Sequence, residues 1–309
     1  MDRWLDSPRL VRRVASRSMS VDAAELGDLT LSMVKGENGY QKKEVYRLLD
    51  WLQQVVKPDL ICLTNLLVGG AIPVLKRELN IPVLVTLQGD DVFLDELTEP
   101  WREQVLTEMR FLAKQADGFL TFSSFYRERM ARLLEVPAEK FSLTPLGVSV
   151  EEFDGVYQKR REKKAGSTIG YFARLAPEKG FDLVVDAFIQ LAAQVPESKL
   201  IVAGWLSEKD REFYAEQLAF FSEIDVFTVP ARFAEPKGLY LLEAMASALP
   251  VVAPDAGAFP ELIDASGAGL LCSHDDAEDL ALKLTAVLTA ENRQATREEK
   301  GTRWVSASG

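Results

Sequence analysis

The segment "EPKGLYLLEAMASALPVVAPDAGAFPELI" (residues 235–263) is the clearest indication of the fold class. It begins as a loop, continues as an apolar segment of helical spacing that must end before Pro250, and passes into the short apolar run "PVVAP" (250–254). Just upstream, "IDVFTV" (224–229) is another apolar run of strand length. A strand, a loop, a helix and a second strand in this order are typical of a parallel sheet with crossover helices.

The same alternation extends through the rest of the chain. Apolar runs bounded by turn residues predict strands at 59–64, 82–87, 117–122, 141–146, 168–173, 199–204, 224–229, 250–254 and 269–272. The predicted fold is therefore α/β, with two Rossmann-like, doubly wound domains. We place the first domain at 1–154, a polar and basic linker at 155–167, the second domain at 168–290 and a tail at 291–309.

Composition restricts the function classes. The 309 residues carry a formal net charge of −11, which argues against a nucleic-acid partner because phosphate neutralisation needs a basic face. The two cysteines, Cys62 and Cys272, are far apart and belong to no C-x-x-C pair, so neither a disulfide framework nor a zinc site is expected. No apolar run approaches the roughly 18 residues of a membrane span, and no signal peptide is evident. We expect a cytoplasmic protein.

The first 20 residues are basic and carry apolar side chains among five arginines. Two interpretations are open. The segment can be a helix that lies on the inner membrane face, or an amphipathic helix that packs on its own domain. Packing helices are the commoner case, so peripheral membrane association stays the weaker alternative.

Two acidic side chains flank Gly238 in the quoted segment. A glycine at a helix start leaves the first-turn N–H groups open to an anion, and the helix dipole is positive there. Glu235 precedes this turn, and Glu243 follows it on the helix. Two basic residues, Arg174 and Lys179, follow the strand at 168–173 and can bind a diphosphate. The alternatives are solvated loop cations, a dipole partner for Glu235 and a solvated helix-surface acid for Glu243.

These residues carry a resemblance to family 4 glycosyltransferases of the GT-B fold. The second half matches through "GYFARLAPEKGFDLVVDAF", "LIVAG", "IDVFTVP", the E-x7-E run "EPKGLYLLE" and "AMASALPVVAPDAGAFPELI". The first half is similar to the acceptor-side domain of this family through "TLQGDDVF", "DGFLTFSSFYRERM" and "LTPLGVSVEEF".

The resemblance implies a sugar transfer from a nucleoside diphosphate sugar to an unknown acceptor, a saccharide or a lipid-linked molecule, with the anomeric configuration retained and no metal or other cofactor. It implies that Arg174 and Lys179 bind the donor diphosphate together with the backbone of Gly238, Leu239 and Tyr240. Glu235 would contact the donor sugar and Glu243 the ribose. Gln88 and Asp90 would face the sugar or the acceptor. We expect adjacent Asp90 and Asp91 to be loop acids rather than a metal pair.

Several positions depart from the family pattern. The chain begins downstream of the expected first strands, the segment between Gly204 and Asp225 has room for about one helix, and the tail ends before the usual closing helix. Gln88 replaces a frequent histidine, and Ala248 replaces a glycine at a helix end. We therefore expect a truncated or internally deleted transferase with exposed sheet edges and a tendency to aggregate. The alternative function is an inactive remnant that binds nucleotide weakly or serves as an interaction module.

Overall fold

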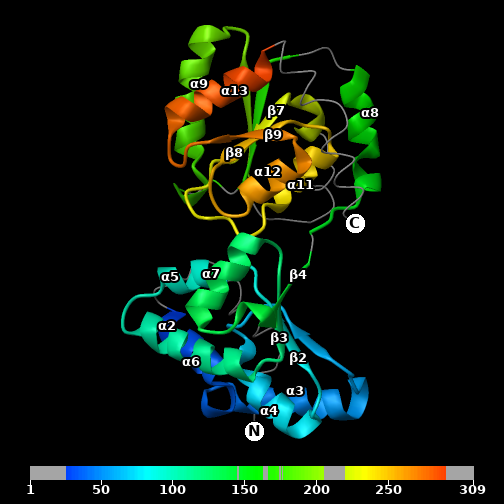
Figure 1. The fold of residues 1–309 in the computed structure, drawn as a ribbon, viewed down its shortest axis with the longest axis vertical. Coiled ribbons are helices and arrows are strands. Elements are labelled where there is room, and N and C mark those ends of the chain that lie inside the picture. The colour runs from blue at the N-terminus through cyan, green and yellow to red at the C-terminus, as the bar shows by residue number, and fades with distance from the viewer. Residues whose placement is uncertain are drawn as a thin grey trace, which may run out of the picture. The chain divides into compact units, whose positions relative to one another are not determined.

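The computed structural model describes residues 26–144, 146–162, 166–173, 175, 177–204 and 220–289. By its internal contacts the chain divides into two compact units. The first comprises residues 1–121 and 129–142, and the second residues 122–128 and 143–309. Each unit contains one parallel sheet with helices, so the predicted α/β class is confirmed (Figure 1). The predicted N-terminal segment 1–20, most of 204–225 and the tail 291–309 lie outside the described residues.

The first unit is built on a four-stranded sheet in the order β1-β2-β3-β4. Its strands are β1 (Ile61–Leu63), β2 (Val83–Thr86), β3 (Gly118–Thr121) and β4 (Phe141–Leu143). Its helices are α2 (Gly27–Lys35), α3 (Lys42–Trp51), η3 (Leu52–Val56), α4 (Ile72–Leu79), α5 (Asp90–Glu96) and α6 (Trp101–Gln115), with short turns η2 (Gly36–Asn38), η4 (Gly69–Ala71) and η5 (Ala138–Lys140). Helix α7 (Ser124–Leu134) begins in the second unit and ends in the first.

The second unit contains a five-stranded parallel sheet in the order β6-β5-β7-β8-β9. Its strands are β5 (Thr168–Phe172), β6 (Lys199–Ala203), β7 (Val226–Thr228), β8 (Val251–Pro254) and β9 (Gly269–Cys272). Its helices are η6 (Val150–Phe153), α8 (Asp154–Glu162), η7 (Pro177–Lys179), α9 (Phe181–Gln194), α11 (Leu239–Ala246), α12 (Phe259–Ser266) and α13 (Ala277–Leu288). Helices α9 and α13 pack side by side (Figure 1).

The nine strands in the described part of the chain lie within the nine predicted runs. Strands β7 and β8 are buried at every position, whereas the edge strands β6 and β9 are partly exposed. Continuous apolar runs are what a parallel sheet covered on both faces requires.

The segment 155–167, predicted as a linker, is in large part helical. Helix α8 covers residues 154–162 and belongs to the second unit. Val156 lies in the core of that unit, and the buried Arg160 guanidinium donates to the carbonyl oxygens of Phe221 and Ile224. The polar composition concealed this helix, since one apolar residue and one long cation are enough to attach a mostly solvated helix.

None of the helices in the described part of the chain has the length and apolar character needed to span a bilayer.

Candidate active site

The order of the strands in the second sheet places the candidate site. From β5 the chain winds to one side to form β6, and then returns to the other side of β5 to form β7. The order of winding therefore reverses between β5 and β7. Open parallel sheets bind ligands beyond the carboxyl ends of their strands at such a reversal. The loop after β5 carries Lys179, and the loop after β7 carries Glu235.

These two predicted residues meet. Lys179 Nζ lies 3.1 Å from Glu235 Oε2, although they are separated by 56 positions in the sequence. The hydroxyl of Tyr240 donates to the same oxygen at 3.2 Å. The two charged side chains are largely buried, with 17% of Lys179 and 12% of Glu235 exposed. A cation, a carboxylate and a phenol thus form one cluster at the carboxyl edge of the sheet.

Aromatic side chains surround the ammonium group. Lys179 Nζ lies 4.5 Å from the ring centroid of Phe233 and 5.3 Å from that of Tyr240, so cation–π attraction adds to the ion pair. Burial and the Glu235 carboxylate raise the pKa of Tyr240 well above its usual value, which keeps this hydroxyl a neutral donor at pH 7. Burial raises the pKa of Tyr171 to about 12, and its hydroxyl donates to the Lys179 carbonyl at 3.3 Å.

The first turn of α11 lies in the same loop. Gly238 caps this helix with φ 71°, a left-handed conformation that glycine adopts without strain. Leu239 is the first helical residue, and its side chain is exposed. Tyr240 follows, so its side chain contacts Glu235 while its main chain belongs to the helix start. A helix N-terminus beside a lysine is suited to an anion such as a diphosphate.

The loop after β8 completes this edge of the sheet. The N–H of Ala258 donates to the carbonyl of Glu235 at 2.8 Å. Gly257, with φ 65°, lies so close that an added Cβ would be 2.5 Å from both the main-chain N and the main-chain O of Glu235. Loops from three neighbouring strands therefore fix the position of Glu235.

Two further residues, Glu243 and Arg174, are predicted to bind the sugar donor. Glu243 lies on the second turn of α11, partly buried, and it takes part in a polar contact of its own. Arg174 lies outside the described residues. Their predicted roles therefore stay predictions.

The predicted sugar-facing residues belong to the first unit. Asp90 is 3% exposed, and its carboxylate accepts from the N–H groups of Leu66 (2.6 Å) and Gln88 (3.2 Å). The Gln88 side-chain amide donates to the Thr64 carbonyl at 2.8 Å. These two side chains thus hold the loops after β1 and β2 together. Asp91 is also buried, and it pairs with Arg129. The prediction of loop acids is wrong, because Asp90 and Asp91 are the first two residues of α5. Contact of Gln88 and Asp90 with a substrate stays a prediction.

Sequence reasoning missed Arg232, Phe233 and Gly257. Arg232 donates to the carbonyl of Pro177 and pairs with Asp182 and Asp275. His274, which has no evident partner in the sequence, lies with its Nε2 3.0 Å from the Arg232 carbonyl oxygen. The one available signal was position, since Arg232 and Phe233 precede Glu235 in the loop of a predicted strand.

Both halves of the chain are similar to known proteins. Residues 166–290 match the family model described as "Glycosyl transferases group 1", and residues 7–147 match the "Glycosyl transferase 4-like domain". The chain is 29% identical over 222 residues to the lipopolysaccharide core biosynthesis mannosyltransferase LpsB of Rhizobium meliloti, covering 62% of this chain and 61% of that protein. It is 27% identical over 277 residues to the sulfoquinovosyl transferase SQD2 of Arabidopsis thaliana, covering 79% and 53%.

Two solved structures share the fold. Sucrose-phosphate synthase from Thermosynechococcus elongatus aligns with a TM-score of 0.66 at 21% identity, covering 88% of this chain and 77% of that one. Anabaena Alr3699/HepE in complex with UDP and glucose aligns with a TM-score of 0.67 at 18% identity, covering 87% and 79%.

The fold and the sequence matches together define the chain as a glycosyltransferase-like protein of the GT-B fold. Within that class it is a member of the family 4-like glycosyltransferases. The chain spans less than two thirds of the length of these two relatives.

Proposed function

We propose that the protein transfers a sugar from a nucleoside diphosphate sugar to an acceptor, a saccharide or a lipid-linked molecule, with retention of the anomeric configuration. The observation that carries this proposal is the Lys179–Glu235 pair beside the N-terminus of α11, at the reversal of the second sheet. The relatives named above support it, since one is a mannosyltransferase, one a sulfoquinovosyl transferase, and a structural neighbour was solved with UDP and glucose.

In this proposal the bond between the anomeric carbon and a phosphate oxygen breaks, and negative charge develops on the departing diphosphate. A hydroxyl oxygen of the acceptor forms the new bond to the anomeric carbon, and the hydroxyl proton passes to the departing diphosphate. Lys179 and the first-turn N–H groups of Gly238, Leu239 and Tyr240 would stabilise that charge, with Arg174 as a second cation. Glu235 would accept hydrogen bonds from the donor sugar, and Glu243 from the ribose. A sugar-binding or acceptor-binding role of Gln88 and Asp90 is a separate part of this proposal.

We further propose that this transfer requires no metal ion. The ammonium group and the positive end of a helix would supply the charge compensation that a divalent cation supplies in other phosphate chemistry. Asp90 and Asp91 already bind backbone amides and Arg129, respectively, which leaves them poorly placed as a pair of ligands. Addition of a chelator should leave the transfer rate unchanged.

Two substitutions test the proposal. Lys179→Ala and Glu235→Ala should each lower transfer, or hydrolysis of the donor, by about a hundredfold or more, because charge stabilisation and sugar positioning are lost. Matched controls are Lys199→Ala and Glu197→Ala, exposed residues at the amino end of β6 and in the turn before it. The wild-type preparation must first be shown to be active. If both site variants then retain full activity, the assignment is refuted.

Titration with UDP and GDP separates the two functions that the sequence leaves open. The transferase should bind one of these nucleotides and turn over the matching sugar donor. Binding without any transfer would favour a nucleotide-binding module, and neither heat nor thermal shift at millimolar nucleotide would favour an interaction module.

A further inference from the structure

Arg232 connects the loop of Glu235 to the turn of Lys179. Its main-chain N–H donates to the Glu178 carbonyl at 2.8 Å, and its Nη1 donates to the Pro177 carbonyl at 2.8 Å. Both acceptors belong to η7, the turn whose last residue is Lys179. The backbone and the side chain of one residue thus hold this turn at two successive carbonyl groups.

Two carboxylates fix the guanidinium group in turn. Asp182 at the start of α9 accepts from Nη1 (2.8 Å) and Nη2 (2.6 Å) in a bidentate arrangement, and Asp275 accepts from Nε at 2.7 Å. The hydrogen bonds from Arg232 hold the pKa of Asp182 below its usual value. Both acids are more than half exposed, so these pairs add little free energy of unfolding. Their effect is geometric, because a planar fork bound on two sides has one orientation.

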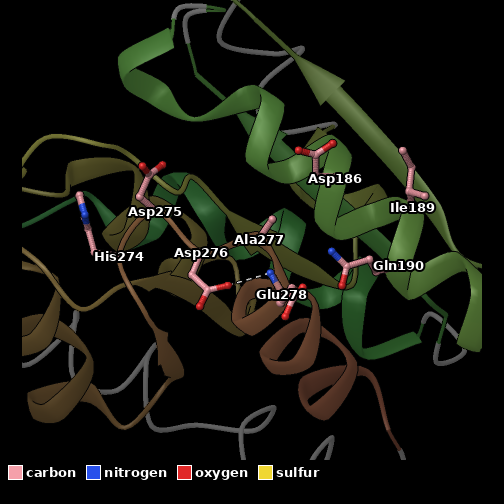
Figure 2. A pocket seen from close by; sticks show the side chains of 8 residues that line it. All are labelled: Asp186, Ile189, Gln190, His274, Asp275, Asp276, Ala277 and Glu278. Atoms are coloured by element: carbon pink, nitrogen blue, oxygen red, sulfur yellow. Dashed lines mark hydrogen bonds between the residues drawn. The ribbon is translucent and has the colours of Figure 1, made fainter.

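The second carboxylate comes from the wall of a surface depression between α9 and the turn before α13. Figure 2 shows His274, Asp275 and Asp276 on that turn, with Asp186 and Gln190 on α9. The acids on the turn already have partners. Asp275 binds Arg232, and Asp276 accepts from the N–H groups of Glu278 and Asp279. This wall therefore supports Arg232 from outside, and His274 contacts the Arg232 carbonyl from the same turn.

We propose that Arg232 is a positioning residue for the donor site, which holds the turn Pro177–Lys179 so that Lys179 stays beside Glu235. This inference rests on the proposed function for its consequence in donor binding. Arg232 itself contacts neither Lys179 Nζ nor Glu235 through any hydrogen bond described above, so its influence passes through the turn. A lysine at position 232 keeps the charge but lacks the fork that reaches two carboxylates and a carbonyl.

A double-mutant cycle tests the route of this influence. Arg232→Gln should weaken UDP or GDP binding by about tenfold, since a small displacement of a binding group has a large effect. In a Lys179→Ala background the same substitution should change the dissociation constant by less than about twofold, because coupled residues are not additive. Asp275→Asn removes only one partner of the guanidinium group and should give a smaller loss of nucleotide affinity. This milder variant keeps the test valid if Arg232→Gln does not fold. Equal effects of Arg232→Gln in both backgrounds would overturn the proposal.

A measurement without ligand separates this inference from the proposed function. The rate at which acetic anhydride acylates Lys179, relative to exposed Lys199, can be followed by mass spectrometry in the ligand-free chain. Release of the turn should raise that ratio by about threefold or more in Arg232→Gln, because the ammonium leaves its partly buried ion pair. An unchanged ratio would refute the positioning role, whereas wild-type protein that binds no nucleotide would refute only the proposed function.

Discussion

At the scale of single residues, Asp90 is a buried acid whose carboxyl pKa is strongly shifted by its surroundings. Burial raises the pKa of its carboxyl to about 6, against the opposing hydrogen bonds from Leu66 and Gln88. A carboxyl whose pKa is higher in the folded chain than in the unfolded chain favours folding while it is protonated. That contribution is complete below pH 4 and is lost as the pH rises through 6.

We therefore predict that Asp90→Asn gains stability relative to wild type between pH 4 and pH 7, by at most about 3 kcal/mol. Urea unfolding at several pH values measures the difference. Asp50→Asn, on the exposed face of α3, serves as the control and should show no comparable trend. A constant difference between wild type and Asp90→Asn across this range would contradict the prediction.

Ala248 replaces the glycine that the family pattern has at a helix end, and its backbone conformation lowers the free energy of unfolding. It follows α11 with φ 54°, in the left-handed region where glycine is usual. Ala248→Gly should raise the free energy of unfolding by about 1 kcal/mol. The same substitution at Ala193, an exposed position within α9, should lower it by about 1 kcal/mol. Urea unfolding of both variants tests the prediction. The changes in the free energy of unfolding must have opposite signs.

At the scale of elements, the loop after β8 constrains the loop after β7. Gly257→Ala would place a Cβ against the main chain of Glu235 and would also strain a residue at φ 65°. We predict that nucleotide binding weakens by about tenfold or more in this variant. Calorimetric titration with UDP and GDP measures the loss.

The control for this substitution is Gly155→Ala in α8, where an added Cβ meets no atom within 4 Å. It should bind nucleotide as wild type does. If Gly257→Ala also binds as wild type, then the position of Glu235 does not depend on the β8 loop.

Elements were more predictable than the contacts between their loops. Each strand lies in a short apolar run, and such a run predicts a strand of a parallel sheet from neighbouring residues alone. The family resemblance implies that Lys179 and Glu235 bind the same donor, but their direct contact was not predicted, since nothing local joins positions 56 apart. For Arg232 the sequence offers only its position before Glu235, because its partners come from the loops after β5 and β9. Helix α8 was missed because its buried stripe is narrow.

At the scale of the whole molecule, the first unit exposes large apolar side chains in the segment that precedes its end strand β1. Among the described strands, β1 pairs with β2 and lies at the end of the sheet order. Trp51 and Val55 in the preceding helical segments are 54% and 68% exposed, and Leu60 is 47% exposed. Open edges and apolar patches favour association between copies.

We predict concentration-dependent self-association that charge on this surface suppresses. The double variant Trp51→Lys and Val55→Lys should be mainly monomeric over about 1 to 100 μM, a range in which exposed apolar surface drives association. Sedimentation velocity measures the distribution. Tyr40→Lys, at a 73% exposed residue outside this surface, should associate as wild type does. A monodisperse wild-type monomer over the whole range would contradict the prediction.

The Lys179–Glu235 pair also has a consequence for how fast a nucleotide arrives. In the ligand-free chain the ammonium is already neutralised by a carboxylate 3.1 Å away, while the whole chain carries a net charge of −11. An approaching diphosphate therefore meets little long-range attraction and a general repulsion. Added salt screens that repulsion, so the association rate constant should stay level or rise with ionic strength, opposite to the behaviour of a site that draws in its anion electrostatically.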